Sequence, residues 1–253
     1  MRALTRTPSG VLGECELTFV DRAPIDVERA RRQHAAYNAA LRACGVEVEV
    51  LPAAADLPDA VFVEDTAVIL DELAVLTWPG TPARRPELAL IEPVLRRWRP
   101  LTAITPPATL EGGDVLRIGR TLFVGLSVRT NAAGIAALRT LAEPLGYEVV
   151  PVTVTGCLHL KTGVTALDDE TVLINADWID PSPFAAYRQV PVDPAEPWGG
   201  NVLRLDTRLL MNQAFPRTLD RVAGLGYDVL SLDISEFLKA EAGLTCMSLI
   251  VPV

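Results

Sequence analysis

The feature of this sequence that most constrains its fold is a short pattern that recurs at a nearly constant interval. A polar turn between two apolar runs, the pattern of a β-hairpin, occurs four times, and successive turns lie roughly 40 to 50 residues apart. The predicted hairpins cover residues 66–77, 114–125, 163–175 and 202–212. Repeats of this length are typical of solenoids and propellers, so we expect one small unit used several times.

A helical pattern followed by a short strand separates the hairpins. The clearest example begins at a capping residue, Asp26, has an apolar stripe with spacings of three and four residues, and stops at Gly45. The predicted helices cover 26–44, 131–145 and 218–225, and the strands after them cover 46–51, 147–152 and 227–232. Two weaker helices are predicted to end near Arg99 and Tyr187.

The number of units predicts a closed ring. There are five helix-then-strand units but four hairpins, and the two ends of the chain, residues 2–5 and 247–251, can form the fifth. We therefore expect a single α/β domain over residues 1–253, with five ββαβ repeats around a central cavity. A ring is one body, so the proline-rich stretch 191–198 is not expected to be a domain boundary.

Composition argues against several classes of partner. The chain has 23 Lys and Arg residues against 32 Asp and Glu residues, a formal net charge of −9, which leaves no basic footprint for nucleic acid. No apolar run approaches the roughly 18 residues of a membrane helix. The four cysteines are scattered, without a C-x-x-C pair or a secretory signal, so disulfides and structural zinc are not expected. We expect a cytoplasmic protein with no nucleic acid or membrane partner.

Polar residues lie inside apolar runs just before the first strand of several repeats. Equivalent positions in a ring converge on its axis, so we expect these residues to share one cavity. The set consists of Glu64, Asp65, Glu111, His159 and Cys246. Taken singly, a buried histidine or cysteine more often serves only for packing, as we expect for His34 and the other three cysteines. A metal site is not favoured, because one histidine and no known ligand spacing are available.

A cavity with several carboxylates and a thiol suits a planar cation. Guanidinium and amidinium groups pair with carboxylates in a bidentate manner. If the substrate were a free amino acid, its own carboxylate would need an arginine. Arg84 and Arg85 follow the first hairpin and Arg129 follows the second, although each taken alone is more simply a solvated loop residue.

Six ordered motifs then point to a known family. They lie at 62–68 (FVEDTAV), 79–85 (PGTPARR), 111–116 (EGGDVL), 123–131 (FVGLSVRTN), 158–161 (LHLK) and 244–246 (LTC). Together they resemble dimethylarginine dimethylaminohydrolase (dimethylargininase), a family of the pentein superfamily of guanidine-modifying enzymes. The resemblance runs from about Cys15 to the C-terminus. It implies a five-bladed pentein α/β propeller, in agreement with the repeat count.

The resemblance also implies an activity and a set of catalytic residues. The expected reaction is hydrolysis of Nω-methylated L-arginine to citrulline and a methylamine, without a metal or organic cofactor. Cys246 matches the nucleophile, His159 the proton donor and later general base, and Glu111 the carboxylate that orients His159. Because carboxylates surround it, we expect Cys246 to stay a neutral thiol until a cationic substrate arrives.

Further positions match the substrate-binding residues of the family. Asp65 and Glu64 match the pair that grips the guanidinium, and Arg84 and Arg129 match the residues that bind the α-carboxylate. Asp59 and the backbone carbonyls of Leu17 and Ala240 match the surroundings of the α-amino group. In this sequence Ala240 replaces a larger aliphatic residue and Glu241 replaces an aspartate, and the second change could alter the amino-group pocket.

The sequence leaves several alternatives open. The same Cys, His and carboxylates would serve an arginine deiminase or an amidinotransferase, and the ring alone would serve a non-catalytic binding module. The expected partner is a small-molecule substrate, and a homodimer is one possible assembly of the chain. Zinc could inhibit through Cys246 and His159 without being a cofactor.

Overall fold

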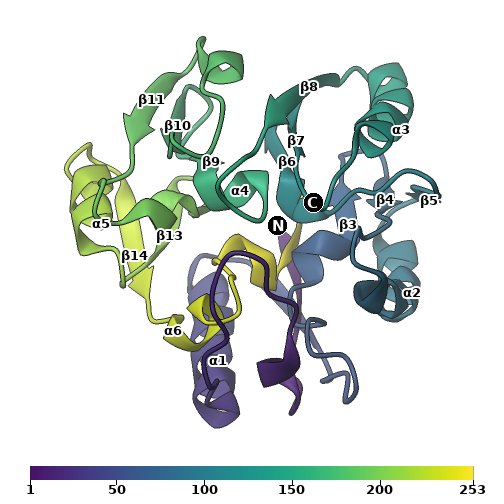
Figure 1. Cartoon of the computed structure of the whole chain (residues 1–253), viewed down its shortest axis with the longest axis horizontal. Helices are drawn as coiled ribbons and strands as arrows, with labels where there is room; N and C mark the ends of the chain where they lie inside the picture. Colours follow the sequence, from purple (N-terminus) through teal and green to yellow (C-terminus); the bar gives the residue numbers. More distant parts are fainter. Residues whose placement is uncertain (253) are drawn as a thin grey trace.

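The computed structural model describes residues 1–252 and contains five three-stranded sheets arranged around one axis (Figure 1). Each sheet consists of an antiparallel pair and a third strand that runs parallel to the middle one. In spatial order the sheets are β15 (Leu249–Val251), β1 (Arg2–Arg6), β2 (Glu47–Leu51); β3 (Ala67–Ile69), β4 (Ala74–Leu76), β5 (Leu101–Ala103); β6 (Val115–Ile118), β7 (Thr121–Leu126), β8 (Glu148–Thr153); β9 (Val164–Ala166), β10 (Thr171–Ile174), β11 (Arg188–Pro191); and β12 (Leu203–Leu205), β13 (Arg208–Asn212), β14 (Asp228–Leu232). The predicted fivefold α/β propeller is confirmed.

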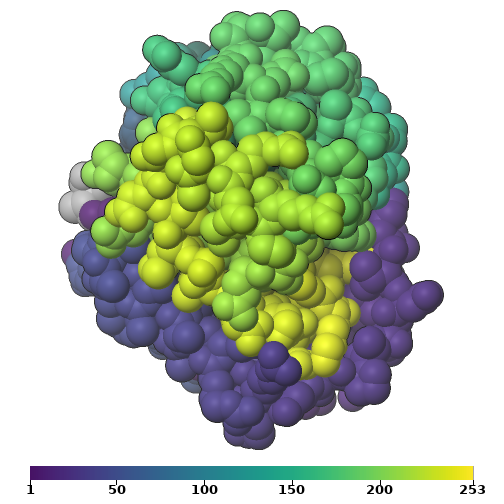
Figure 2. Space-filling view, turned by 90° about the vertical axis from the view of Figure 1, so that its left-hand side faces the viewer, coloured from purple at the N-terminus to yellow at the C-terminus, as the bar shows by residue number. Residues whose placement is uncertain are grey.

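The two ends of the chain close the ring. β15 pairs antiparallel with β1, with Leu249 opposite Leu4, and β1 pairs parallel with β2. Both ends consequently lie near the middle of the ring in Figure 1. Figure 2 shows the N-terminal segment (purple) lying against the C-terminal part of the chain (yellow). The fifth hairpin predicted from the two termini is therefore present.

Helices connect the middle strand to the third strand in four of the described repeats. They are α1 (Val27–Ala43), α2 (Leu88–Trp98), α3 (Ala132–Ala142) and α5 (Pro216–Ala223). The cap predicted at Asp26 is observed, because its Oδ1 accepts a hydrogen bond from the Arg29 amide at 2.9 Å. Asn131 caps α3 in the same way through the Gly134 amide at 2.7 Å.

The helix predicted to end near Tyr187 is wrong. The segment between β10 and β11 contains only a single 3₁₀ turn, Ser182–Phe184. Asn175 and Asp180 accept hydrogen bonds from backbone amides two residues ahead, and these local turns compete with a helix. Prolines at 181 and 183 remove two further amide donors. The fourth repeat therefore returns to its sheet without a helix.

The apolar core is divided among the repeats. Buried side chains form five clusters, and a typical cluster joins one sheet to its helix and to the neighbouring repeat. Because the clusters lie between sheets and helices, none of them fills the central axis of the ring. On one face, the first strands of the hairpins line an axial channel of about 520 Å³.

A short helical turn precedes the first strand of every described hairpin. These turns are η2 (Val63–Thr66), η4 (Gly112–Asp114), α4 (Leu160–Gly163), η7 (Pro197–Gly200) and η8 (Thr245–Met247). They occupy equivalent places in the repeats and contact one another near the axis, for example η2 with η4 and with η8. The polar residues predicted to be equivalent thus lie in or directly before these helical turns.

Candidate active site

The helical turns bring the predicted catalytic residues to one place. Asp65 lies in η2 and Cys246 in η8, and Glu111 and His159 are the residues directly before η4 and α4. All but Glu111 line one small cavity that is separate from the axial channel, and Glu111 is fully buried next to it. The expectation of one shared cavity holds for Asp65, His159 and Cys246; Glu111 reaches the site through His159, and Glu64 lines the axial channel instead.

His159 and Glu111 form the central pair. His159 Nε2 lies 2.8 Å from Glu111 Oε2, and the other carboxylate oxygen accepts a hydrogen bond from the Gly80 amide at 3.1 Å. Burial alone would lower the pKa of His159, but the negative charge of Asp65 and the hydrogen bond to Glu111 raise it to about 9. Burial would raise the pKa of Glu111, and the bond to His159 reverses this and lowers it. The imidazole is therefore a proton donor at neutral pH.

Two glycines make this approach possible. A Cβ atom on Gly113 would lie 2.6 Å from His159 Nδ1 and 2.7 Å from Asp65 Oδ1. A Cβ on Gly112 would collide with the backbone carbonyl of Glu64. The Gly-Gly pair in the EGGD motif therefore lets the backbone of η4 pass directly under the imidazole.

Asp65 is fixed from several sides. Its Oδ1 accepts a hydrogen bond from the Gly113 amide at 2.9 Å, and its Oδ2 pairs with Arg84 Nη1 at 2.5 Å. Burial opposes ionisation, but the charges of His159 and Arg84 outweigh it and lower the pKa of Asp65 to about 2. Asp65 is thus a fixed negative charge on the cavity floor.

The surroundings of Cys246 favour its protonated thiol form. Its Sγ accepts a hydrogen bond from the Gly243 amide at 3.4 Å. Burial first, and then the charges of Glu64 and Asp65, raise the pKa of this thiol far above its ordinary value. The direction matches the expected neutral thiol, but burial is the larger cause and the carboxylates add to it.

Asp114 is a functional candidate that the sequence reasoning did not single out. It is fully buried, its Oδ1 accepts a hydrogen bond from the Leu160 amide at 2.9 Å, and its Oδ2 accepts one from Ser127 Oγ at 2.7 Å. The first bond fixes the start of α4 immediately after His159. Its position as the second carboxylate of the EGGD motif was the available signal.

The residues expected at the amino-acid end of a substrate hold a loop closed over the cavity. Asp59 accepts the Glu16 amide at 3.2 Å, and Glu241 accepts the amides of Thr18, at 2.7 Å, and Phe19. Arg129 donates to the side chains of Thr18 and Thr81 and lies 3.6 Å from Glu111. The remaining free volume is about 20 Å³.

Of the other predicted binding residues, some line the cavity and some lie outside it. Ala240 and Glu241 line the cavity, and Glu241 has a left-handed backbone with φ of 57°. Leu17 lies in the covering loop between the two anchored residues Glu16 and Thr18. Arg85 stacks on Trp78 and donates to the Pro79 carbonyl, outside the cavity.

Arg84 borders the cavity but is already heavily engaged. Besides Asp65, its guanidinium donates to both carboxylate oxygens of Glu87, at 3.0 and 2.9 Å, and to the backbone carbonyls of Asp59 and Phe62. Its side chain is 5% exposed. Two protein carboxylates, Asp65 and Glu87, pair with Arg84, whereas only Glu111, at 3.6 Å, lies near Arg129. A substrate carboxylate would therefore meet less competition at Arg129.

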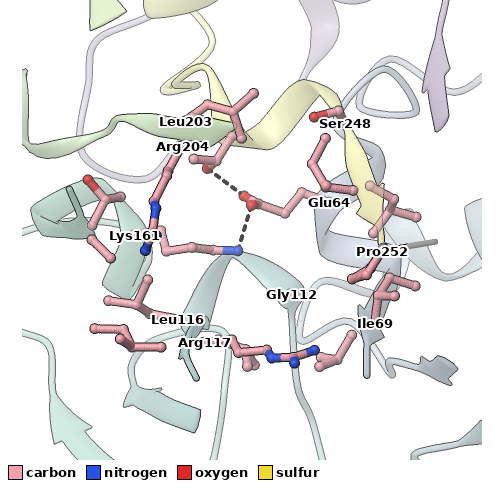
Figure 3. Close-up of a pocket in the computed structure, with 18 of the residues that line it drawn as sticks. Glu64, Ile69, Gly112, Leu116, Arg117, Lys161, Leu203, Arg204, Ser248 and Pro252 are labelled. Atoms are coloured by element: carbon pink, nitrogen blue, oxygen red, sulfur yellow. Dashed lines mark hydrogen bonds and ion pairs between the residues drawn. The ribbon is translucent and has the colours of Figure 1, made fainter. Parts of the chain in front are cut away.

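Glu64 faces the axial channel rather than the small cavity. Its Oε1 pairs with Lys161 Nζ at 2.5 Å, and its Oε2 accepts a hydrogen bond from Thr245 Oγ1 at 2.8 Å. Figure 3 shows Glu64 pointing across the channel toward Lys161. Glu64 therefore acts on Cys246 in two ways: its negative charge raises the pKa of the thiol, and its hydrogen bond holds Thr245, the residue before Cys246.

A metal could be considered at Asp65, Glu111 and His159, whose ligand atoms all lie within 4.8 Å of one another. Each of these atoms already has a protein partner: Asp65 binds Arg84 and Gly113, and Glu111 binds His159. The donor set fits an ion-paired acid–base centre better than a metal site, so the absence of a cofactor remains a prediction.

Comparisons with known proteins identify the family. Residues 21–183 match the family model described as N,N dimethylarginine dimethylhydrolase, eukaryotic. The N(G),N(G)-dimethylarginine dimethylaminohydrolase of Streptomyces coelicolor is 43% identical over 98% of this chain and 95% of its own length. The chain belongs to the dimethylarginine dimethylaminohydrolase family. The enzyme of the same name from Pseudomonas aeruginosa is 34% identical, and the match covers 97% of both chains.

Solved structures of dimethylarginine dimethylaminohydrolases share this fold and carry relevant ligands. A cysteine-to-serine mutant of the Pseudomonas aeruginosa enzyme in complex with citrulline has a TM-score of 0.93 and 32% identity, with 98% of each chain covered. A histidine-to-glycine variant of a dimethylarginine dimethylaminohydrolase, as an adduct with S-methyl-L-thiocitrulline, has a TM-score of 0.94 and 33% identity over the same coverage. Among the described residues, no helix has the length and apolarity needed to cross a membrane.

Proposed function

We propose that this member of the dimethylarginine dimethylaminohydrolase family hydrolyses Nω-methylated L-arginine to L-citrulline and dimethylamine or methylamine. We assign Cys246 as the nucleophile, His159 as the acid and base, and Glu111 as its orienting carboxylate. One observation carries the assignment: equivalent turns of four repeats gather a thiol, an imidazolium and two buried carboxylates at one cavity. The family membership selects the substrate class and disfavours the deiminase, amidinotransferase and binding-module alternatives.

The polar groups around the cavity suit the two ends of the substrate. Asp65 is an ionised carboxylate at the buried end, where a guanidinium would lie, and Glu64 adds a second negative charge from the channel side. Arg129, with Arg84 beside it, would bind the α-carboxylate. The α-amino group would be surrounded by Asp59, Glu241 and the carbonyls of Leu17 and Ala240.

Substrate binding itself would activate the nucleophile. Without a bound cation, burial and then the charges of Glu64 and Asp65 raise the pKa of Cys246 and disfavour a thiolate. A bound guanidinium places a positive charge among these carboxylates and so lowers the pKa of Cys246. Cys246 would then release its proton to solvent, and the thiolate would form with the substrate carbon already held in position.

The chemistry follows from these protonation states. The Cys246 thiolate attacks the central guanidinium carbon and gives a neutral tetrahedral adduct. The His159 imidazolium donates its proton to the dimethylamino nitrogen, the carbon–nitrogen bond breaks, and an S-alkylthiouronium remains. The neutral imidazole then takes a proton from water, and the hydroxide adds to the thiouronium carbon. As the carbon–sulfur bond breaks, the new hydroxyl group loses its proton to the released amine or to solvent, which yields citrulline and the Cys246 thiolate.

The covering loop must move for this cycle to begin. A cavity of about 20 Å³ has room for about one water molecule and therefore excludes an amino acid. Substrate groups would take over the partners that now hold the loop: the carboxylate replaces Thr18 on Arg129, and the ammonium replaces the Glu16 amide on Asp59.

Citrulline formation from asymmetric dimethylarginine, compared with plain arginine, tests the proposal. Wild type and Cys246→Ser are assayed in parallel without added metal, with Cys44→Ser as a matched control because Cys44 lies outside the cavity. We expect turnover of the methylated substrate by wild type and Cys44→Ser and none by Cys246→Ser. Turnover of arginine alone would make the protein a deiminase. No turnover of either substrate would favour the amidinotransferase or the binding module.

A further inference from the structure

Asp114 lies where two of the sequence motifs meet, and the proposed reaction gives it no direct part. It is the last residue of the EGGD motif and is fully buried. The FVGLSVRTN motif packs against it, because a Cβ on Gly125 would lie 2.5 Å from Asp114 Oδ1. The missing side chain at Gly125 therefore leaves room for the carboxylate beside β7.

Both oxygens of this carboxylate accept hydrogen bonds from segments that carry site residues. Oδ1 accepts from the Leu160 amide at 2.9 Å, directly after His159, and Oδ2 accepts from Ser127 Oγ at 2.7 Å. Burial raises the pKa of Asp114 on balance, although the charge of His159 and these hydrogen bonds oppose the shift. Donors that face both oxygens suit an ionised carboxylate, which can only accept.

Ser127 connects this carboxylate to the backbone of Arg129. Its Oγ, which donates to Asp114, also accepts hydrogen bonds from the amides of Arg129, at 3.0 Å, and Thr130, at 3.2 Å. The Ser127 amide donates to the Thr130 carbonyl at 3.1 Å and closes the turn 127–130. One hydroxyl group thus fixes the backbone that carries Arg129, the proposed ligand of the substrate α-carboxylate, to the cavity.

Hydrogen bonds rather than apolar packing hold this turn. Leu126 is 43% exposed and Val128 is 64% exposed, so neither side chain anchors the turn in the core. The far end of the turn is held by the Glu111 amide, which donates to Thr130 Oγ1 at 3.1 Å. The near end is held by Asp114. A turn with so little apolar contact depends on these bonds for its position.

We propose that Asp114 and Ser127 are positioning residues that place the general acid and the carboxylate-binding arginine relative to each other. This inference rests on the proposed function. One oxygen of Asp114 fixes the backbone after His159, which acts at the guanidinium end of the substrate. The other oxygen fixes, through Ser127, the backbone of Arg129 at the amino-acid end. One buried carboxylate thereby sets the span between the two ends of the bound substrate.

Two variants of Ser127 that differ in one hydroxyl group test the proposal in steady-state kinetics with asymmetric dimethylarginine. Ser127→Val loses the hydroxyl, whereas Ser127→Thr has nearly the same shape and retains it. We expect KM to rise about tenfold in Ser127→Val, with kcat within about twofold of wild type, because the change weakens binding of the α-carboxylate and leaves the Leu160 bond intact. Ser127→Thr should keep KM within about threefold of wild type.

Asp114→Asn tests the other partner of the same bond. Its side-chain oxygen can still accept from the Leu160 amide, but its nitrogen would face the Ser127 hydroxyl, a donor against a donor. We expect a similar rise in KM. In the double variant Asp114→Asn/Ser127→Val the rise should again be about tenfold, because both changes remove one bond. Asp114→Leu removes both bonds and should also lower kcat about tenfold; thermal denaturation shows whether each variant is folded.

Several results would overturn the proposal. They are an unchanged KM in Ser127→Val, an equal rise in Ser127→Val and Ser127→Thr, or a rise of about a hundredfold in the double variant, which would mean independent effects. An unchanged kcat in folded Asp114→Leu would refute the part that concerns His159, and if this variant does not fold the other three still decide the link to Arg129. Absence of turnover by wild type would refute the proposed function itself, so the two failures are distinguishable.

Discussion

Gly113 offers a sharp test of how the active site is built. In Gly113→Ala the new Cβ would lie 2.6 Å from His159 Nδ1 and 2.7 Å from Asp65 Oδ1, where an ordinary contact needs about 3.5 Å. The imidazole and carboxylate must therefore retreat by roughly 0.9 Å. Both are side-chain atoms, so the backbone can remain in place.

A displacement of this size in a catalytic group reduces turnover on the order of a hundredfold, which corresponds to about 2.7 kcal/mol. We expect kcat/KM for asymmetric dimethylarginine to fall by this factor in Gly113→Ala, together with some loss of melting temperature, because both displaced groups are buried and held by Arg84 and Glu111. Gly112→Ala should lose more stability, because its Cβ would meet the backbone carbonyl of Glu64. Gly10→Ala is the matched control, since its Cβ would meet nothing within 4 Å.

Steady-state kinetics and thermal denaturation of the three variants separate these outcomes. Activity in Gly113→Ala within a factor of three of wild type would refute the claim that His159 must sit directly above this backbone. A large loss of stability in Gly113→Ala with normal activity of the folded fraction would mean that the contact is structural only.

The remaining predictions concern protonation, the covering loop and a helix cap. The pKa of His159 is raised to about 9, so its acid form persists below that pH and kcat/KM should fall as pH rises through 9. In a pH–rate profile, Glu111→Gln should move this alkaline decrease in kcat/KM to lower pH. An alkaline decrease at the same pH in wild type and Glu111→Gln would contradict the pairing of Glu111 with His159. Glu241→Ala should free the covering loop and accelerate iodoacetamide labelling of Cys246 in the absence of substrate. If Glu241→Ala and wild type were labelled at the same rate, Glu241 would not hold the loop closed. Asn131→Ala should lower the free energy of unfolding by about 1 kcal/mol in urea titration, and no change would mean that its bond to α3 is not stabilising.

The fold could be predicted because its repeats are marked by local signals. Turns between apolar runs, the cap at Asp26 and the stop at Gly45 each depend on neighbouring residues alone. The prediction failed before Tyr187, where Asn175 and Asp180 satisfy backbone amides locally and the prolines withhold donors. There the composition resembled a helix, but the hydrogen bonds favoured turns.

The site was predictable only as a set of residues that converge. Repeat equivalence brought Asp65 and His159 together, but it could not say which way each side chain points. Glu64 therefore turned out to face the axial channel and Lys161, although its neighbour Asp65 faces the cavity. Likewise, the engagement of Arg84 by Glu87 depends on a buried pairing that the sequence pattern does not reveal.

The central claim is that Cys246 forms the covalent intermediate, and rapid-quench mass spectrometry during turnover tests it most directly. Protein mixed with excess asymmetric dimethylarginine is acid-quenched within the first turnovers, digested and mapped. The account predicts a peptide containing Cys246 whose mass has increased by that of the substrate less dimethylamine. Citrulline formation with Cys246 unmodified at every time, or with the adduct on another residue, would contradict it.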